Sequence, residues 1–515
     1  MNRLGAVMLL LMFGTAPARA DTSAPADWDP ALASAVYTTA LAFMTPRILE
    51  PVPLPQLTLW GLRGLTALDP ALTLELRSGQ LTLLSAGRVI ATAASPKPDS
   101  AQDWADLAVA MAAAGRDVSV AVRHAGTAGV VRSFFDELFN HLDTFSRYVP
   151  PGEATEDRAR RSGQAGAGIT LLSRGGAVFV AAVAADGPAA LAGVRPGDRV
   201  LAVESQRVTG QGAATVLGWI AGPEDTTVQL SLRGRDARSR SVEVLRALVP
   251  PESVFVERRA GILLLRVTAF NSRTDARLSH ELERGTARKP TNGARPPSGI
   301  VIDLRGNGGG LVREAAAVAD ELLPEGIVVT AVGRNPRANR IWRSGGAELA
   351  SDLPVVVMVD GRSASAAEIV AAALADRGRA VVVGSVTQGK GLVQAIAPLP
   401  DGGELFVTWS RLLAPLGWPI QGLGVLPQVC TSTGTERLQL QLANLAAGNQ
   451  LMAADLARQH ETRPPVPVAQ MLALRGACPA AEGRDGDLET AKFLIGHPAA
   501  YATALLPPFT GLSAP

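Results

Sequence analysis

Four short runs of apolar residues constrain the fold of this chain more than any other feature of its sequence. They are GILLLRV, GIVIDLR, LPVVVMVD and RAVVVG, and all of them lie between residues 261 and 384. Each is apolar at successive positions, which is typical of a strand buried on both faces of a sheet. Helical stretches such as EAAAVADELL and ASAAEIVAAALADRG separate the runs. The sequence therefore predicts an α/β domain with a largely parallel core sheet.

The rest of the chain divides around this domain. At 515 residues it is too long for one ordinary core, and about two to four domains are expected. We expect a helical region over 21–150, a β-rich module over 154–248, the α/β domain over 255–430 and a helical extension over 431–515. The first region contains AQDWADLAVAMAAAGRD and VVRSFFDELFNHLDTF, which carry apolar residues at helical spacing.

The first 20 residues, MNRLGAVMLLLMFGTAPARA, fit a secretory signal cleaved before Asp21. Their apolar run, Leu4 to Phe13, is about half of the roughly 20 residues that a membrane span requires. The mature protein is therefore expected in the periplasm or otherwise outside the cytoplasm. The two cysteines, Cys430 and Cys478, are expected to form a disulfide in such a compartment.

Charge and composition exclude other classes. A net charge of +2 without a concentrated basic stripe argues against nucleic acid as a partner. Two cysteines and five scattered histidines lack the spacing of metal ligands, so no metal and no cofactor is expected.

Lysine is rare in this chain. Of its 49 basic residues only four are lysines: Lys97, Lys289, Lys390 and Lys492. Lys390 stands between two glycines in VTQGKGLVQ, and a desolvated lysine can lose its proton where an arginine cannot. The segment nearly matches a phosphate-binding loop, but Gly391 replaces the required Ser or Thr and a strand follows instead of a helix.

Ser365, in GRSASAAEIV, begins a predicted helix directly after a buried strand. Ser363 and Ser365 could both be ordinary N-cap residues. If Ser365 is a nucleophile, it needs a base, and His280 and His460 are both distant in sequence, although distant residues can converge. Lys390 is the simpler partner. To act as a base near neutrality, Lys390 needs a pKa about 3 below its reference value of about 10.4. That fall corresponds to on the order of 4 kcal/mol of stabilisation of the neutral amine relative to the charged one.

The β-rich module contains the predicted strands GAGITLL, AVFVAAV, DRVLAV and TTVQLSL, with short helices at PAALAG and GAATVLGWI. Gly166, Ala167, Gly168 and Ile169 stand at the head of its first strand. Such a glycine-rich turn can bind an anion, including the carboxylate of an extended peptide, through its N–H groups. Together with GPAALAGVRPGDRVLAV, this segment resembles a PDZ domain.

The segments GRSASAAEIVAAALADRGRAVVVGSVTQGKGLVQ and DLRGNGGG, together with the PDZ-like module, resemble the carboxy-terminal processing (tail-specific) proteases, serine peptidase family S41. The resemblance runs from about Leu142 to Val429 and includes LDTFSRYVPP and GWPIQGLGVLPQV. It implies a multidomain α/β protein: a crotonase-like peptidase core with an inserted β-rich PDZ domain and helical N- and C-terminal regions.

The resemblance also implies roles for particular residues. Ser365 matches the family nucleophile, Lys390 its general base and Gln394 the residue that orients the lysine. Ala366 and Gly309 are the candidate N–H donors of an oxyanion hole. Glu368 and Asp376 match charged positions of the family and are expected to be mainly structural.

The sequence thus predicts an exported serine endopeptidase that binds protein substrates by flexible, apolar C-termini and cleaves them through an acyl-enzyme. The alternative is a non-catalytic peptide-binding scaffold on the same fold. The first 120 or so residues and those after Val429 match the family only loosely, so an adaptor protein and a homo-oligomer both stay open.

Overall fold

The computed structural model describes residues 27–185, 187–287, 295–346 and 348–507. The chain divides into two compact units, one formed by Met1–Leu41 and Pro53–His141 and the other by Ala42–Val52 and Leu142–Pro515. The expected signal segment, residues 1–20, lies outside the described residues. None of the described helices is both long enough and apolar enough to cross a membrane.

The first unit is mainly helical. Two of its helices begin at serine caps, because the hydroxyls of Ser100 and Ser119 accept hydrogen bonds from the N–H groups of Asp103 and Val122. Its helices are α1 (Pro30–Met44), α2 (Leu54–Leu62), α3 (Gly64–Leu68), α4 (Ala101–Val118) and α5 (Val120–Phe139).

The predicted helical region also contains a three-stranded antiparallel sheet, which corrects that expectation. Its strands are β1 (Leu72–Arg77), β2 (Gln80–Ser85) and β3 (Arg88–Ala94). Ser78 and Gly79 connect the first pair and Ala86 and Gly87 the second, and all four residues have positive φ. Two-residue hairpin turns of this kind need positive φ at both positions. The alternation in LTLELR carried the signal for a strand.

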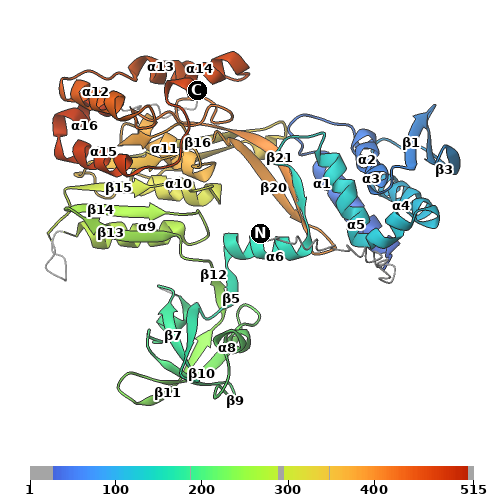
Figure 1. Ribbon diagram of the computed structural model, residues 1–515, viewed down its shortest axis with the longest axis horizontal. Coiled ribbons are helices and arrows are strands. Elements are labelled where there is room, and N and C mark those ends of the chain that lie inside the picture. Colours follow the sequence, from blue (N-terminus) through green and yellow to red (C-terminus); the bar gives the residue numbers. More distant parts are fainter. Residues whose placement is uncertain (1–26, 186, 288–294, 347, 508–515) are drawn as a thin grey trace, which may run out of the picture. The chain divides into compact units, whose positions relative to one another are not determined.

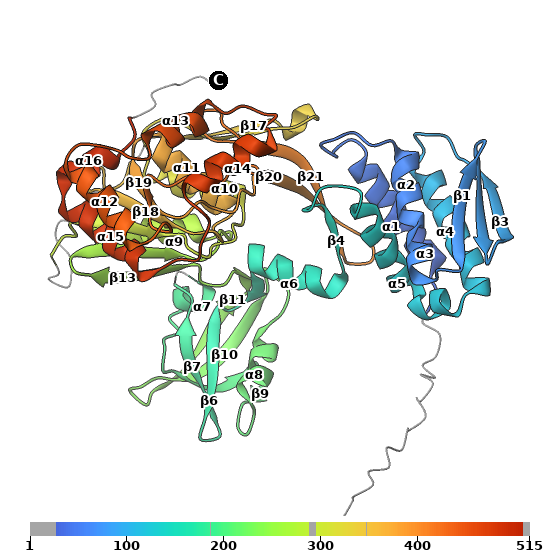
Figure 2. The ribbon, with the colours of Figure 1, turned by 45° about the horizontal axis from the view of Figure 1, so that its top comes forward.

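The β-rich module in the second unit has the strand order β11-β10-β8-β7-β6. Its elements are β6 (Ile169–Arg174), β7 (Ala177–Val183), α7 (Pro188–Leu191), β8 (Arg199–Val203), β9 (Gln206–Arg207), α8 (Ala213–Ile220), β10 (Thr227–Arg233) and β11 (Ser239–Leu245). Val178, Val200, Leu230 and Val216 belong to its own buried core. The four predicted strands and both predicted helices are confirmed (Figure 2).

Two short strands pair at the point where the chain enters and leaves this module. β5 (Gln164–Gly166) enters the module after α6 (Pro151–Ser162), and β12 (Ala247–Val249) leaves it. They pair with each other in antiparallel register, Gln164 opposite Val249. The chain therefore leaves the module beside the place where it entered (Figure 1).

The main sheet of the second unit has the order β13-β14-β15-β18-β19-β22. Its strands are β13 (Val254–Arg259), β14 (Ile262–Val267), β15 (Gly299–Asp303), β18 (Val355–Val359), β19 (Ala380–Gly384) and β22 (Val429–Cys430). Every pair is parallel except β13 with β14. The largely parallel core sheet is thus confirmed.

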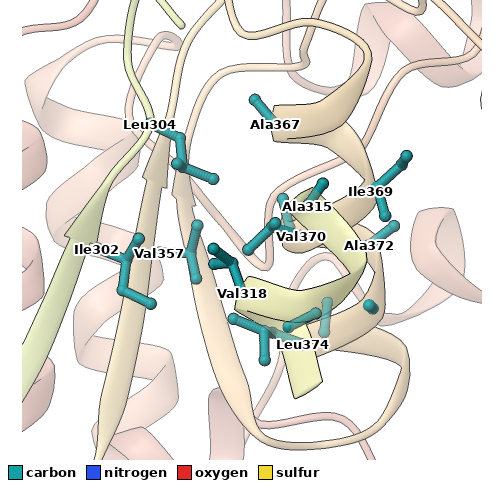
Figure 3. Packing of buried hydrophobic residues seen from close by; sticks show 14 of the residues in the cluster. Ile302, Leu304, Ala315, Val318, Val357, Ala367, Ile369, Val370, Ala372 and Leu374 are labelled. Carbon is teal, nitrogen blue, oxygen red and sulfur yellow. The ribbon is translucent and has the colours of Figure 1, made fainter. Parts of the chain in front are cut away.

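Helices cover both faces of this sheet, which explains the continuous apolar runs. Ile300, Ile302 and Val357 point into a core shared with α9 (Thr274–Thr286), α10 (Val312–Asp320) and α11 (Ala366–Asp376). The alternate residues Val301 and Val356 point into a second core, which includes residues of α12 (Thr435–Ala446), α15 (Asp485–Gly496) and α16 (Pro498–Ala504). Figure 3 shows the first core, in which side chains of α10 and α11 meet those of the strands.

A second, smaller sheet has the order β17-β16-β21-β20 and is antiparallel, with β4 (Arg147–Val149) beside β21. Its strands are β16 (Gly326–Val332), β17 (Arg340–Ser344), β20 (Leu392–Pro398) and β21 (Glu404–Leu413); a 3₁₀ turn, Pro336–Ala338, precedes β17. The helical C-terminal extension is completed by α13 (Ala453–Glu461) and α14 (Val468–Ala477).

Candidate active site

Ser365 lies on a tight turn between the buried strand β18 and helix α11. Its backbone has φ 55° and ψ −112°, a conformation that a residue with a side chain rarely adopts. The turn is held by buried Asp360, whose Oδ1 accepts hydrogen bonds from the N–H groups of Gly306 at 2.9 Å and Ser363 at 3.0 Å. The strain is therefore maintained by surrounding hydrogen bonds, as is common where a nucleophile is presented.

Glu368 connects the Ser365 turn to the loop that carries Lys390. Its carboxylate is fully buried and accepts hydrogen bonds from the N–H groups of Ser365 at 2.7 Å, Gly389 at 2.7 Å and Lys390 at 2.9 Å. The Thr387 hydroxyl donates a fourth hydrogen bond to it. Burial raises the pKa of Glu368, and these four donors act in the opposite direction by favouring the charged form. One carboxylate thus fixes the backbone at both predicted dyad residues.

The environment of Lys390 favours a neutral amine. Burial lowers the pKa of Lys390, the positive charge of Arg147 on β4 lowers it further, and the charge of Glu368 raises it. The Nζ atom lies 5.0 Å from the centroid of the Phe145 ring. Among the described residues, no hydrogen bond joins Lys390 Nζ to Ser365 Oγ. Glu368 thus links the backbones of the two residues, while their side chains form no hydrogen bond with each other in this structure.

The glycine loop after β15 lies against the Ser365 turn. An atom added at the Cβ position of Gly309 would stand 2.8 Å from Ser365 Cβ and 2.8 Å from the carbonyl oxygen of Ala364. Asn307 joins the two turns, because its carbonyl accepts a hydrogen bond from the Ala364 N–H at 2.9 Å. The Gly309 N–H donates to Asn307 Oδ1 at 2.8 Å, so in this structure it is engaged within its own loop. Ala366 begins α11, where N–H groups lack acceptors within the helix.

Gln394 forms its side-chain hydrogen bonds with groups other than Lys390. Its Nε2 donates hydrogen bonds to the Leu392 carbonyl at 3.2 Å and to Thr408 Oγ1 at 3.1 Å. Thr408 in turn donates to Asp143 Oδ1 at 2.7 Å. The side chain predicted to orient the lysine therefore lies on β20, as expected, and is held by β21.

Asp376 lies at the opposite end of α11 from Ser365. Its Oδ2 accepts hydrogen bonds from Trp418 Nε1 at 2.9 Å and from the Leu416 N–H at 3.2 Å, and His460 Nε2 lies 3.3 Å from its Oδ1. An eleven-residue helix is about 16 Å long, so Asp376 is remote from the Ser365 hydroxyl. Its contacts agree with the structural role expected for it.

The predicted peptide site forms part of a cavity of about 760 Å3. Gly166 to Thr170, Ala182 to Ala185 and the α8 residues Leu217 and Ile220 are among its lining residues. Gly168 has φ +70°, a backbone conformation that favours glycine. The carbonyls of Ala167 and Gly168 accept hydrogen bonds from inside the module, from the N–H groups of Ala189 and Ala184.

Cys430 and Cys478 form a disulfide with a Cα–Cα distance of 5.7 Å. It joins the end of β22 to the end of α14. No group of three or more acidic, histidine or cysteine side chains in the described residues has the arrangement of a metal site.

The sequence interpretation missed three side chains of this site. Phe145 and Arg147 belong to the quoted segment LDTFSRYVPP, and Thr387 belongs to VTQGKGLVQ, but none was assigned a role. The central position of Glu368 carried a local signal, because the spacing Ser365-x-x-Glu368 matches a helix capping box. The position of Phe145 beside Lys390 carried none, since 245 residues separate them along the chain.

Comparisons with known proteins identify the family. The model of Peptidase family S41 matches residues 261–431, and a PDZ domain model matches residues 179–234. The carboxy-terminal-processing protease of Bartonella bacilliformis is 31% identical over 303 residues, which covers 58% of this chain and 69% of that protein. The chloroplastic C-terminal processing peptidase of Tetradesmus obliquus is 29% identical, with 68% and 77% covered.

Among solved structures, a photosystem II D1 C-terminal processing protease is 27% identical, with a TM-score of 0.35, and the match covers 72% of this chain and 92% of that one. The identity to the Bartonella protein over most of its length and the S41 match across the strands and loops of the site together show the family. The chain belongs to peptidase family S41, the carboxy-terminal-processing proteases, which are serine peptidases, and it carries a PDZ domain.

Proposed function

We propose that the protein is an exported serine endopeptidase that binds the C-terminus of a protein substrate in its PDZ domain and cleaves the substrate with a Ser365–Lys390 dyad. The observation that carries the proposal is the buried Glu368 carboxylate, which holds the N–H groups of both residues. The strained backbone of Ser365 and the lowered pKa of Lys390 support the same roles.

In this mechanism the neutral Lys390 amine removes the proton from Ser365 Oγ, and the oxygen attacks the carbonyl carbon of the scissile peptide. The carbonyl oxygen becomes an oxyanion, for which the N–H groups of Ala366 and Gly309 are the proposed donors. The C–N bond then breaks, the lysine ammonium gives its proton to the leaving amine, and an acyl-enzyme is formed. Water hydrolyses the ester, with Lys390 taking the proton from water and returning it to Ser365.

Two contacts must change for this sequence to run. Lys390 Nζ must form a hydrogen bond with Ser365 Oγ, and the Gly309 N–H must leave Asn307 Oδ1 to reach the oxyanion. Catalytic hydrogen bonds often form only in the complex with substrate. The proposal therefore assigns both changes to the substrate-bound state.

The PDZ cavity supports recognition of a flexible, apolar C-terminus. Leu217 and Ile220 line the cavity with apolar side chains, and the Gly166 to Ile169 segment lines it as well, where its backbone N–H groups are the proposed donors to a carboxylate. Protein tails with apolar terminal residues are thus the proposed substrate class.

The test is turnover of a flexible protein that ends in apolar residues. The parent should cleave it, whereas Ser365→Ala, Lys390→Ala and Lys390→Arg should not. Lys492→Ala is the matched control, because Lys492 forms a surface pair with Glu489 at 2.7 Å and should leave turnover unchanged. Equal peptide binding by the parent and Ser365→Ala, with no cleavage by either, would support the scaffold alternative instead. Export is tested separately, by sequencing the N-terminus of the protein recovered from the periplasm, which should begin at Asp21.

A further inference from the structure

The C-terminal extension takes part in the structure of both catalytic loops, although it lies beyond the residues that the S41 model matches. The Ala481 carbonyl accepts hydrogen bonds from the Gly361 N–H at 2.8 Å and from Ser385 Oγ at 3.0 Å. The Cys478 carbonyl accepts one from the Val386 N–H at 3.3 Å. The segment after α14 therefore contacts the turn before Ser365 and the loop before Lys390.

Arg475, on α14, makes the most direct of these connections. Its Nη1 donates hydrogen bonds to the carbonyls of Thr387 and Leu423, both at 3.0 Å, and to that of Gly422 at 3.4 Å. Thr387 belongs to the loop that ends at Lys390. Gly422 and Leu423 belong to the neighbouring loop of the segment GWPIQGLGVLPQV. One guanidinium thus spans both loops.

These two loops are also joined to each other. The Gly422 N–H donates to the Gly389 carbonyl at 2.9 Å, and the Val425 N–H donates to Thr387 Oγ1 at 2.8 Å. Thr387 is consequently held from two sides, by Arg475 at its carbonyl and by Glu368 at its hydroxyl. Lys390 follows Thr387 by three residues, so the position of the Lys390 backbone depends on the hydrogen bonds that Arg475 and Glu368 form with Thr387.

An arginine suits this place chemically. Three carbonyl oxygens lie within 3.4 Å of Arg475 Nη1, which carries two hydrogens, so the longest contact, to the Gly422 carbonyl, shares a hydrogen with another. Burial lowers the pKa of Arg475 and the nearby charge of Glu368 raises it, and arginine stays protonated in proteins. Its hydrogen bonds are therefore charge-assisted, the stronger kind.

We propose that Arg475 is a positioning residue for the proposed base: it holds the 386–391 loop so that the Lys390 backbone keeps its hydrogen bond to Glu368, which also holds the Ser365 N–H. The Cys430–Cys478 disulfide, three residues after Arg475, fixes the end of α14 for this task. The inference rests on the proposed Ser–Lys function.

The test compares Arg475→Ala and Arg475→Lys with Arg463→Ala. Arg463 is the matched control, because its guanidinium also joins the extension to a core carbonyl, Leu416 O at 2.9 Å, without touching the Lys390 loop. We expect Arg475→Ala to lower kcat at least about tenfold with a smaller change in KM, and Arg475→Lys to recover part of the loss.

The pH profile separates positioning from simple stabilisation. The charged groups that face the Lys390 amine are Arg147 of β4 and Glu368 of α11. A loosened loop admits water to the amine, and loss of the Arg475 charge leaves Glu368 less compensated, so both effects raise the pKa of Lys390. The acid limb of kcat should therefore move to higher pH in Arg475→Ala and stay in place in Arg463→Ala.

Hydrogen exchange gives a readout that does not need turnover. The amides of residues 384–391 should exchange at least about tenfold faster in Arg475→Ala than in the parent or Arg463→Ala. Unchanged exchange would overturn the inference, and so would an Arg475→Ala enzyme with the kcat and pH profile of Arg463→Ala. If the parent itself shows no turnover, the proposed function fails, and the exchange rates still decide whether Arg475 holds the loop.

Discussion

The replacement Glu368→Gln tests the central structural claim about the site. Glu368 accepts four hydrogen bonds, with the N–H groups of Ser365 and Lys390 on Oε2 and the N–H of Gly389 and the hydroxyl of Thr387 on Oε1. Glutamine has the same shape but one acceptor oxygen in place of two. The substitution therefore removes acceptors from the site without leaving a cavity.

The magnitude follows from these partners. The NH2 group of the glutamine is expected to replace Oε1 and face Thr387, because a hydroxyl can also accept a hydrogen bond. The Gly389 N–H, which donates to Oε1 in the parent, is then left without an acceptor. That loss costs about 1.5–3 kcal/mol, and the remaining bonds weaken by about 1 kcal/mol each when the acceptor is neutral. Removal of a fully buried charge offsets several kcal/mol. The free energy of unfolding should consequently change by less than about 2 kcal/mol.

Activity should respond far more strongly than stability. Displacement of a catalytic group by about 1 Å can lower a rate about a hundredfold, and Gly389 is adjacent to Lys390. We therefore expect kcat to fall about a hundredfold with KM nearly unchanged.

The assay combines steady-state cleavage of a flexible, apolar-tailed protein with denaturant unfolding of each variant. Glu281→Gln is the control, since Glu281 is 2% exposed and pairs with Arg277 at 2.9 Å on α9, which contributes no residue to the Ser365 turn or the Lys390 loop. Arg277 lines the peptide cavity, so kcat and not KM is the quantity compared. The Glu281→Gln variant should lose stability while keeping its kcat. A Glu368→Gln enzyme with a kcat within about threefold of the parent would refute the claim that this carboxylate sets the dyad geometry.

Four further outcomes are expected. Gly309→Ala forces a methyl group against the Ser365 turn and should lower kcat at least about a hundredfold. Peptide binding to the PDZ domain, measured by fluorescence anisotropy, should be retained. Normal turnover would mean that the Gly309 loop is not close to Ser365. Ser365→Gly should raise the free energy of unfolding by about 1–3 kcal/mol, because glycine tolerates the positive φ at this position. If thermal melts show that the Ser365→Gly variant is no more stable than Ser365→Ala, the inferred strain is contradicted. Replacing Cys430 and Cys478 by serine removes a covalent bond between residues 48 positions apart and should lower the free energy of unfolding by about 2–4 kcal/mol. An unchanged denaturation midpoint would argue against the disulfide. The pKa of Lys390 is lowered in the folded state, so the contribution of its neutral form to stability is present above pH 10.5 and is lost as pH falls through the lowered pKa. Lys390→Met should therefore be more stable than the parent at neutral pH. The opposite order would argue against burial of the amine.

The sequence determined the parts of this fold that depend on local periodicity. The uninterrupted apolar runs around Val301, Val356 and Val382 predicted strands buried on both faces, since every position of such a strand meets a core. The Ser365 turn and the Lys390 loop were also recognisable, because a polar residue or a rare lysine at the end of a buried strand is visible without a structure. The sheet at Leu72–Ala94 was missed because its strands are short and lie between strongly helical segments.

Only the tertiary structure decided how the site is assembled. Phe145 and Arg475 come from segments far from Glu368 and Lys390 in the chain, and no periodicity links them. Their meeting depends on the register of the parallel strands, which sets the ends of β18 and β19 side by side, and on packing of the C-terminal helix against the loops. Local sequence specifies which residues can do chemistry, but distances between them arise from long-range packing, and those distances fix the hydrogen bonds and the pKa of the Lys390 amine.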